Sequence, residues 1–232
     1  MARCQPWLML GVRYRRDMGL DESPARERFD GLIAGVGSTS GVRIVVGHWH
    51  STPLGAFSDA MVELSDGHRL LVADHDEAAA FISATYEFDE IRVEPVTVRV
   101  VGNRWHVRSA SLELDLTVGR RTGLGWALRA VPRPIAVVPW WCSVTDVVAR
   151  HLVAGVRTKG TAGNDRREWY GATDSRRVLA LTGSFDGRDL GSLAPVDPPP
   201  SFGFSSTPRQ PSVTTVVTTV EVSDPAPDAR PH

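Results

Sequence analysis

Lysine is almost absent from this chain of 232 residues: Lys159 is the only one, and all other basic side chains are arginine or histidine. The net charge of −1 offers no electrostatic attraction for nucleic acid or an anionic membrane surface. Two cysteines, Cys4 and Cys142, are far apart and lack the spacing of metal ligands, so we expect no disulfide framework and a reducing compartment. No apolar run reaches the ~18–20 residues of a membrane span. These absences predict a cytoplasmic protein without nucleic-acid or membrane partners.

Several catalytic motifs are also missing. No G-x-S-x-G sequence marks a hydrolase nucleophile. Gly119, Gly123 and Gly125 fit neither the Walker nor the dinucleotide-binding spacing, so they indicate a flexible connection. We therefore expect no cofactor.

What the chain does have is a series of strand-like segments separated by turn residues. A good two-residue turn, Gly102-Asn103, joins two of them into a long hairpin. Helices between most strands would be needed for a parallel sheet, and they are missing. The fold class predicted is mainly β (α+β): a single large antiparallel β-barrel or strongly curved sheet with two or three short helices, able to enclose a small-ligand cavity. The expected strands cover residues 42–50, 60–64, 68–73, 91–101, 104–118, 153–161, 168–173, 177–185 and 213–222.

Helices are predicted at three places. Residues 23–35 begin with Ser23 as a cap and carry Phe29, Leu32 and Ile33 at helical spacing. Residues 74–86 begin with a capping box in which Asp74 is the cap and Glu77 follows three residues later. A short helix is expected at 124–130, and residues 143–152 fit either a helix or a strand.

The domain organisation expected is simple. Residues 23–222 form one β-barrel domain, residues 1–22 a disordered extension and residues 223–232 a disordered tail. Met1 and Met18 both remain open as the natural start.

The histidine pair His48 and His50 is the first candidate site. Residues two apart on a strand share a face, and His-x-His begins the metal site of cupin barrels. The glutamate of that pattern is missing, because the first acidic residue that follows is Asp59, so we expect no metal. Ser51 lies beside these residues, but adjacency in sequence does not make a catalytic triad.

Two further features are weighed against plain structural roles. Lys159 has Arg157 two residues before it, and a neighbouring cation would lower a lysine pKa toward that of a Schiff-base nucleophile; an exposed lysine is the simpler interpretation.

Aromatic residues could line an apolar pocket or simply fill the core, among them Trp49, Phe57 and Tyr86, and the Trp140-Trp141 pair after Pro139 could mark a partner surface.

Residues 52–59, Thr-Pro-Leu-Gly-Ala-Phe-Ser-Asp, resemble the strand–turn–strand segment of acetoacetate-decarboxylase-like proteins, and the similarity extends over residues 42–90. The resemblance implies a large antiparallel barrel with a deep apolar cavity, often in an oligomer, with Phe57 and Asp59 at the aromatic and acidic motif positions. It also implies a Schiff-base lysine soon after the helix. Residues 87–92 contain none, so the family's decarboxylation is not expected here.

Three functions remain open. The first is binding of a small, largely apolar molecule near His48, His50, Phe57 and Asp59, without Schiff-base decarboxylation. The second is a lyase or hydrolase on the same scaffold, with His48, His50 and Asp59 as acid–base groups. The third is a structural or protein-interaction module, and a homo-oligomer is compatible with all three.

Overall fold

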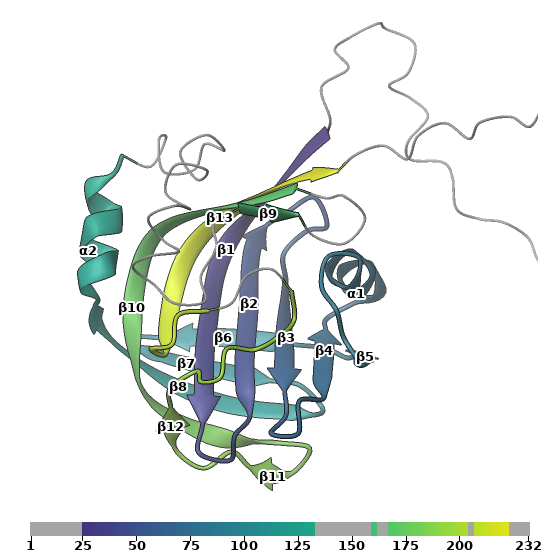
Figure 1. The fold of residues 1–232 in the computed structure, drawn as a ribbon, viewed down its shortest axis with the longest axis vertical. Helices are drawn as coiled ribbons and strands as arrows, with labels where there is room; N and C mark the ends of the chain where they lie inside the picture. The colour runs from purple at the N-terminus through teal and green to yellow at the C-terminus, as the bar shows by residue number, and fades with distance from the viewer. Residues whose placement is uncertain (1–24, 133–158, 162–166, 204–206, 223–232) are drawn as a thin grey trace, which may run out of the picture.

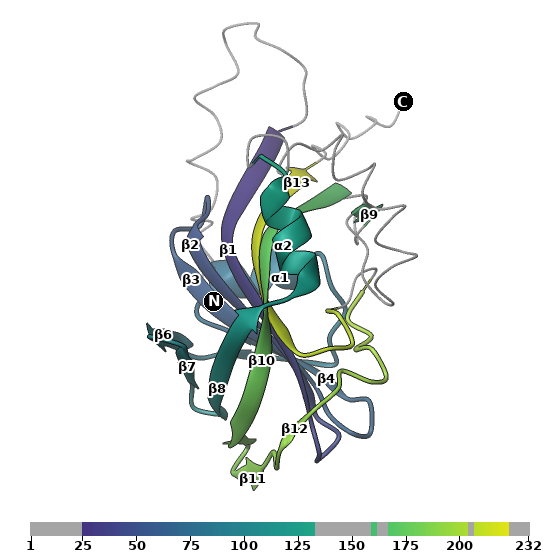
Figure 2. The ribbon, with the colours of Figure 1, turned by 90° about the vertical axis from the view of Figure 1, so that its left-hand side faces the viewer.

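The computed structural model describes residues 25–132, 159–161, 167–203 and 207–222. Ten strands form one continuous sheet in the order β5-β4-β3-β2-β1-β13-β10-β8-β7-β6, with β9, β11 and β12 paired at its margins. The sheet curls until β6–β8 lie behind β1–β4, so that it forms a half-barrel (Figures 1 and 2). The prediction of a mainly β, strongly curved sheet is confirmed. The strands are β1 (Ala25–Ser38), β2 (Arg43–Ser51), β3 (Phe57–Glu63), β4 (Arg69–Ala73), β5 (Glu90–Val93), β6 (Thr97–Val101), β7 (Arg104–Arg108), β8 (Leu112–Arg121), β9 (Lys159–Thr161), β10 (Arg167–Phe185), β11 (Arg188–Asp189), β12 (Leu193–Ala194) and β13 (Ser212–Val222).

One neighbouring pair departs from the antiparallel pattern. Strands β4 and β5 are parallel, because helix α1 (Asp76–Ser83) crosses between them. The predicted strand over residues 91–101 is accordingly two strands: β5 pairs with β4, and only β6 enters the hairpin with β7 about Gly102, whose φ is +61°. The sheet is therefore mixed, with β5 and β6 as its two ends.

The helix predicted over residues 23–35 is wrong. The structure has strand β1 there, paired with β13 on one side and β2 on the other. Phe29 and Ile33 contribute to one face of the strand, while Leu32 packs on the other. The spacing of these residues fits the 3.6-residue period of a helix and also a strand that is buried on both faces. The eleven residue pairs that β1 forms with β13 outweigh a local preference for helix.

The helix predicted over residues 74–86 is shorter than expected and is capped by a different residue. His75 is the N-cap of α1, and its Nδ1 accepts a hydrogen bond from the Ala78 amide. Asp74 instead accepts a hydrogen bond from the amide of Val96. The second helix, α2 (Gly123–Ala130), confirms the short helix predicted at 124–130.

The two faces of the sheet carry separate hydrophobic cores. Ile44, Val46 and Leu70 belong to the larger core, which fills the inside of the curl and takes side chains from both arms of the half-barrel. Phe57 and Leu71 belong to a smaller core on the opposite face, where α1 packs with Ala78, Ala79 and Ile82. The inside of the curl is thus filled with side chains.

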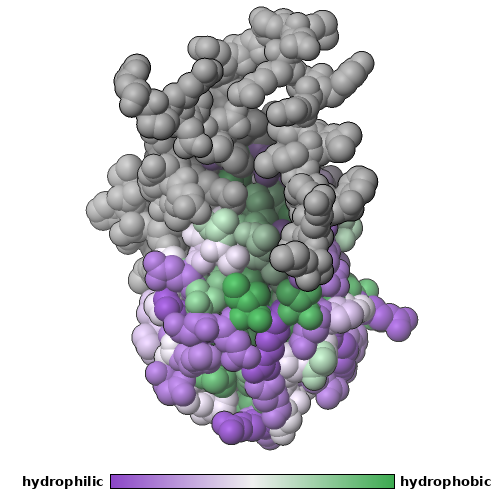
Figure 3. All heavy atoms as spheres, turned by 90° about the vertical axis from the view of Figure 1, so that its right-hand side faces the viewer, coloured by the Kyte–Doolittle hydropathy of each residue, from purple (hydrophilic) through white to green (hydrophobic). Residues whose placement is uncertain are grey.

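The end strand β5 leaves apolar surface open. Ile91 and Val93 are each about half exposed, at 47% and 48%. Seen from the side that carries α1 and β5, hydrophobic residues lie among hydrophilic ones in the middle of the molecule (Figure 3). In the part of the chain that the structure describes, no helix combines the length and hydrophobicity needed to span a membrane.

Several predictions fall on residues outside the described ranges. These are the extension at 1–22, the tail at 223–232, the segment 143–152 and the Pro139-Trp140-Trp141 surface.

Candidate functional site

The antiparallel ladder of β2 and β3 positions the candidate residues. Gly47 pairs with Asp59 and Trp49 pairs with Phe57, and these four residues face the same side of the sheet as α1. The upper ends of β1 and β13 extend over that side in Figure 1. The space between these strands and α1 is the candidate site.

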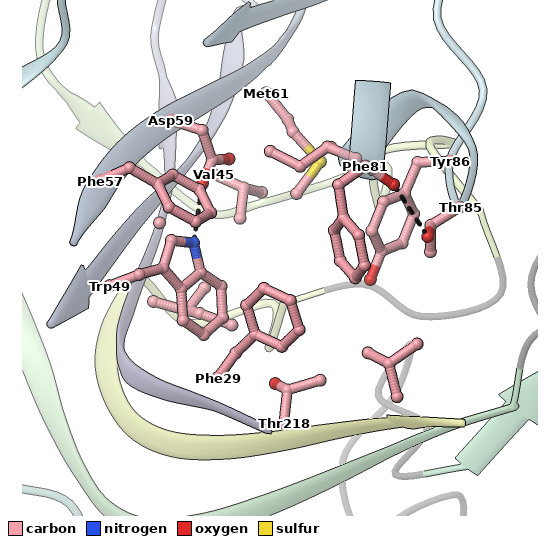
Figure 4. A pocket seen from close by; sticks show the side chains of 14 residues that line it. Phe29, Val45, Trp49, Phe57, Asp59, Met61, Phe81, Thr85, Tyr86 and Thr218 are labelled. Carbon is pink, nitrogen blue, oxygen red and sulfur yellow. Dashed lines mark hydrogen bonds between the residues drawn. The ribbon is translucent and has the colours of Figure 1, made fainter. Parts of the chain in front are cut away.

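A cavity of about 60 Å³ lies there (Figure 4). Its described lining is mostly apolar and aromatic, and none of the lining residues is a lysine, arginine or histidine. Polar side-chain atoms come from five of them, Trp49, Asp59, Thr85, Tyr86 and Thr218. The whole set is Phe29, Ile33, Val45, Gly47, Trp49, Phe57, Asp59, Met61, Phe81, Ile82, Thr85, Tyr86, Thr218 and Val220.

Asp59 is the one acidic side chain among these lining residues. It is 2% exposed, and its Oδ1 accepts a hydrogen bond of 2.8 Å from Trp49 Nε1. Burial raises the pKa of Asp59 to about 6, although the Trp49 hydrogen bond works in the opposite direction. The site therefore holds a carboxyl group that titrates near neutral pH in apolar surroundings.

A second buried carboxyl on the same face shows what Asp59 lacks. Glu63 lies four residues further along β3, and Arg43 Nη2 donates to its Oε1 at 2.6 Å. The backbone N–H and the hydroxyl of Ser201 both donate to the other oxygen of Glu63. The Glu63 charge is thus compensated by three hydrogen-bond donors, one of which is a cation, whereas in the described residues the Asp59 carboxyl has the Trp49 indole.

Two glycines make room for Trp49. A Cβ atom at Gly31 of β1 would collide with the indole ring, and one at Gly47 would lie against both Trp49 Nε1 and Asp59 Oδ1. Both glycines lie mid-strand, where glycine contributes no side chain to packing. Because Gly31 and Gly47 have no side chains, the Trp49 indole can lie against the sheet at both positions and reach Asp59.

Aromatic rings form the wall around the carboxyl group. Phe29 stacks on Phe81 of α1 with ring centroids 4.7 Å apart, and Trp49 meets Phe29 edge-on at 6.1 Å. Phe57 lies 6.4 Å from Trp49, and Tyr86 closes the side near α1 (Figure 4). The wall thus joins β1, β2, β3 and the end of α1.

Thr218 of β13 brings a second polar group into the cavity. Its side chain lines the cavity and is 5% exposed, and its Oγ1 has no hydrogen-bond partner among the described residues. A buried hydroxyl without a partner costs free energy. The hydroxyl is therefore available to a bound molecule.

His48 and His50 lie on the opposite face of β2 from Trp49. His48 Nδ1 is 3.0 Å from Ser58 Oγ, its ring lies 6.0 Å from Trp105 of the larger core, and His50 contacts it edge-on at 4.6 Å. Burial, and then the neighbouring His50, lower the pKa of His48. The structure therefore brings Phe57 and Asp59 together at the cavity but does not bring the two histidines to them.

The remaining candidates take no part in the described site. Lys159 begins β9, where its backbone pairs with that of Trp169. Its side chain is not among those that the structure describes. Residues 87–92 carry surface ion pairs, such as Asp89 with Arg69 at 2.9 Å. Among the described residues, no group of three or more His, Cys, Asp or Glu side chains is arranged to hold a metal ion.

Sequence reasoning named Trp49, Phe57, Asp59 and Tyr86 but missed other parts of the cavity. Phe29 was assigned to a helix, and Thr218 is one of several threonines that alternate with valine along β13. The missed signal was the pair of mid-strand glycines, Gly31 and Gly47, because glycine inside a strand marks a close approach by another group.

Comparisons with known proteins return likeness in structure alone. No protein-family model and no curated protein matches the sequence. Solved structures similar to this chain include the acetoacetate decarboxylase of Legionella pneumophila subsp. pneumophila, at 6% identity and a TM-score of 0.44, covering 94% of this chain and 96% of that one. A second acetoacetate decarboxylase is 9% identical with a TM-score of 0.41, covering 87% and 88% of the two chains. A protein assigned as AttH from Nitrosomonas europaea is 12% identical with a TM-score of 0.28, covering 99% of this chain and 60% of that one. Two of these structures are acetoacetate decarboxylases, the family that residues 52–59 resemble, and the likeness is weak in both identity and TM-score.

Proposed function

We propose that this protein binds a small, largely apolar molecule in the cavity between α1 and the β1–β3 and β13 strands. The observation that carries the proposal is the lining itself, an aromatic and aliphatic wall with a few converging polar groups. Ligand sites in proteins are mostly apolar and use such groups to fix orientation. Among the described residues, the Asp59 carboxyl group accepts a hydrogen bond from the Trp49 indole and keeps further acceptor capacity, and the Thr218 hydroxyl has no partner.

The proposal does not include Schiff-base decarboxylation. The described lining holds no lysine, and residues 87–92 have none in sequence. It also does not include His48 and His50, which lie on the other side of β2.

A homologous series of alcohols tests the proposal. Binding of ethanol, 1-propanol and 1-butanol is followed through the indole N–H signal of Trp49 in NMR spectra, assigned with a Trp49→Phe variant. Each added methylene that enters the cavity is expected to tighten binding about fourfold, corresponding to about 0.8 kcal/mol. Absence of saturable shifts, or affinities that do not change with chain length, would contradict the proposal.

A cavity-filling pair of variants locates the binding. Ile33 lines the cavity, and its neighbour Leu32 packs against the larger core on the other face. We expect Ile33→Phe to weaken alcohol binding strongly and Leu32→Phe to leave it unchanged. Equal binding by both variants would place the alcohol elsewhere.

A further inference from the structure

We infer that the molecule bound in this cavity is a small organic cation, an alkylammonium ion held between the Asp59 carboxylate and the aromatic wall. The inference rests on the proposed function, since it assigns a chemical class to the occupant of the same cavity.

The first reason is the missing counter-charge of Asp59. A buried carboxylate is unfavourable unless a cation and hydrogen-bond donors compensate it. Glu63, on the same face, has both in Arg43 and Ser201. No cationic side chain lies among the described lining residues, and Asp59 receives one indole N–H. An ammonium group would supply the charge and up to three N–H donors.

The second reason is the composition of the wall. Phe29, Trp49, Phe57, Phe81 and Tyr86 surround the space beside the carboxyl group (Figure 4). The face of an aromatic ring attracts a cation within about 6 Å, and this attraction is strongest where water is excluded. A carboxylate beside several rings is the combination that recognises an alkylammonium ion better than a neutral molecule of equal size.

The same arrangement disfavours anions. A carboxylic acid substrate, such as an oxo acid, would bring its carboxylate into a cavity that already holds Asp59 and that offers no cation from its described lining. Like charges in an apolar site repel strongly. The size of the cavity sets the other limit: about 60 Å³ accommodates roughly four to six water-sized groups, so the cation is a short one.

Three probes of similar size and different charge test the inference on the full chain: n-butylammonium, 1-butanol and butyrate, at pH 7.5 and matched ionic strength. The Trp49 indole N–H signal reports binding, because this group donates to Asp59. We expect n-butylammonium to bind at least tenfold more tightly than 1-butanol, and butyrate to give no saturable shift. Equal affinities for n-butylammonium and 1-butanol would overturn the cation inference while leaving the proposed function in place. No saturable shift with any probe would overturn both.

Variants assign the selectivity to the cavity. Asp59→Asn should reduce n-butylammonium affinity at least tenfold and 1-butanol affinity by a much smaller factor, so that the preference for the cation is lost. Asp66→Asn, in the exposed turn between β3 and β4, is the matched control and should change neither affinity. Undiminished n-butylammonium binding by folded Asp59→Asn would overturn the inference. If that variant does not fold, the wild-type comparison of the three probes decides.

Discussion

Gly47 lies directly across the β2–β3 ladder from Asp59, and a Cβ atom at position 47 would occupy the space in which Trp49 Nε1 meets Asp59 Oδ1. The hydrogen bond that holds the buried carboxyl group thus depends on a residue with no side chain. This relationship leads to the first of four predictions about the folded protein.

Gly47→Ala should destabilise the protein by about 1–3 kcal/mol, since the added methyl group forces the indole and the carboxyl group apart. Urea unfolding measures the free energy, and the Trp49 indole N–H shift measures the hydrogen bond. Gly123→Ala is the control, because nothing lies within 4 Å of a Cβ at that position of α2. An unchanged Trp49 signal in Gly47→Ala would refute this account.

The stability of the protein should fall as pH rises through the pKa of Asp59. Burial raises that pKa to about 6 from 3.8, so between these values the folded state binds more protons at this site than the unfolded state. The contribution of Asp59 is then most favourable below pH 4, and about 3 kcal/mol is lost by neutral pH. Unfolding free energies of the wild type and Asp59→Asn, measured from pH 4.5 to 7.5, isolate this change.

The other carboxyl groups contribute equally to the pH dependence of the unfolding free energy in the wild type and in Asp59→Asn. Their contribution therefore cancels when the two proteins are compared. Three kinds of titratable group lie near Asp59 among the described residues: Tyr86 also lines the cavity, His75 at the start of α1 contacts the ring of Phe57, and Arg43 and Glu63 pair further along the same face. Parallel pH profiles for the two proteins would contradict the assignment.

Thr218→Val should stabilise the empty protein by about 1 kcal/mol. The substitution keeps the shape of the side chain and removes a buried hydroxyl that has no partner in the part of the chain that the structure describes. Thr219→Val is the control on the other face of β13, and we expect it to change the unfolding free energy by less than about 0.5 kcal/mol. A destabilised Thr218→Val would mean that the hydroxyl is paired in solution.

Glu63→Gln should cost about 3–5 kcal/mol, because it leaves the buried Arg43 guanidinium without its anion. Glu113→Gln, at an exposed ion pair with Arg108, should cost less than about 1 kcal/mol. Asp59→Asn, which removes a buried carboxylate with no cation, should not destabilise the protein at neutral pH. If Asp59→Asn and Glu63→Gln lose stability equally, the two carboxyl groups are not as different as their partners indicate.

Local patterns identified much of this sheet. The strands β2, β4 and β13, the turn at Gly102 and the curved, mainly β architecture follow from alternation and turn residues, which act over a few residues. Strand β1 does not, because its conformation depends on pairing with β13, almost two hundred residues later in the chain. The cap of α1 shifted by one residue because Asp74 is used by Val96.

The composition of the site depended on register. Alternation correctly put His48 with His50 on one face, and the family resemblance correctly grouped Phe57 with Asp59. Alternation could not give the register between β2 and β3. A shift of one residue in that register moves the side chains of one strand to the other face of the sheet. With Gly47 opposite Asp59, His48 pairs with Ser58; a slip of one residue would have put His48 opposite Asp59 and assembled the acid–base group.

The indole of Trp49 lying across Gly31 and Gly47 links the permitted residue sizes at three positions on two strands. While a tryptophan occupies position 49, neither glycine can gain a side chain. A smaller residue at position 49 would remove the indole from both glycines, but position 31 would stay closed by the carbonyl oxygen of His48, 2.5 Å from a Cβ atom there. Position 47 would then face the Asp59 carboxyl group, which is a movable side chain. Descendants of this sequence are therefore expected to change positions 47 and 49 together and to keep glycine at position 31, and the chemistry of the cavity would change with that pair.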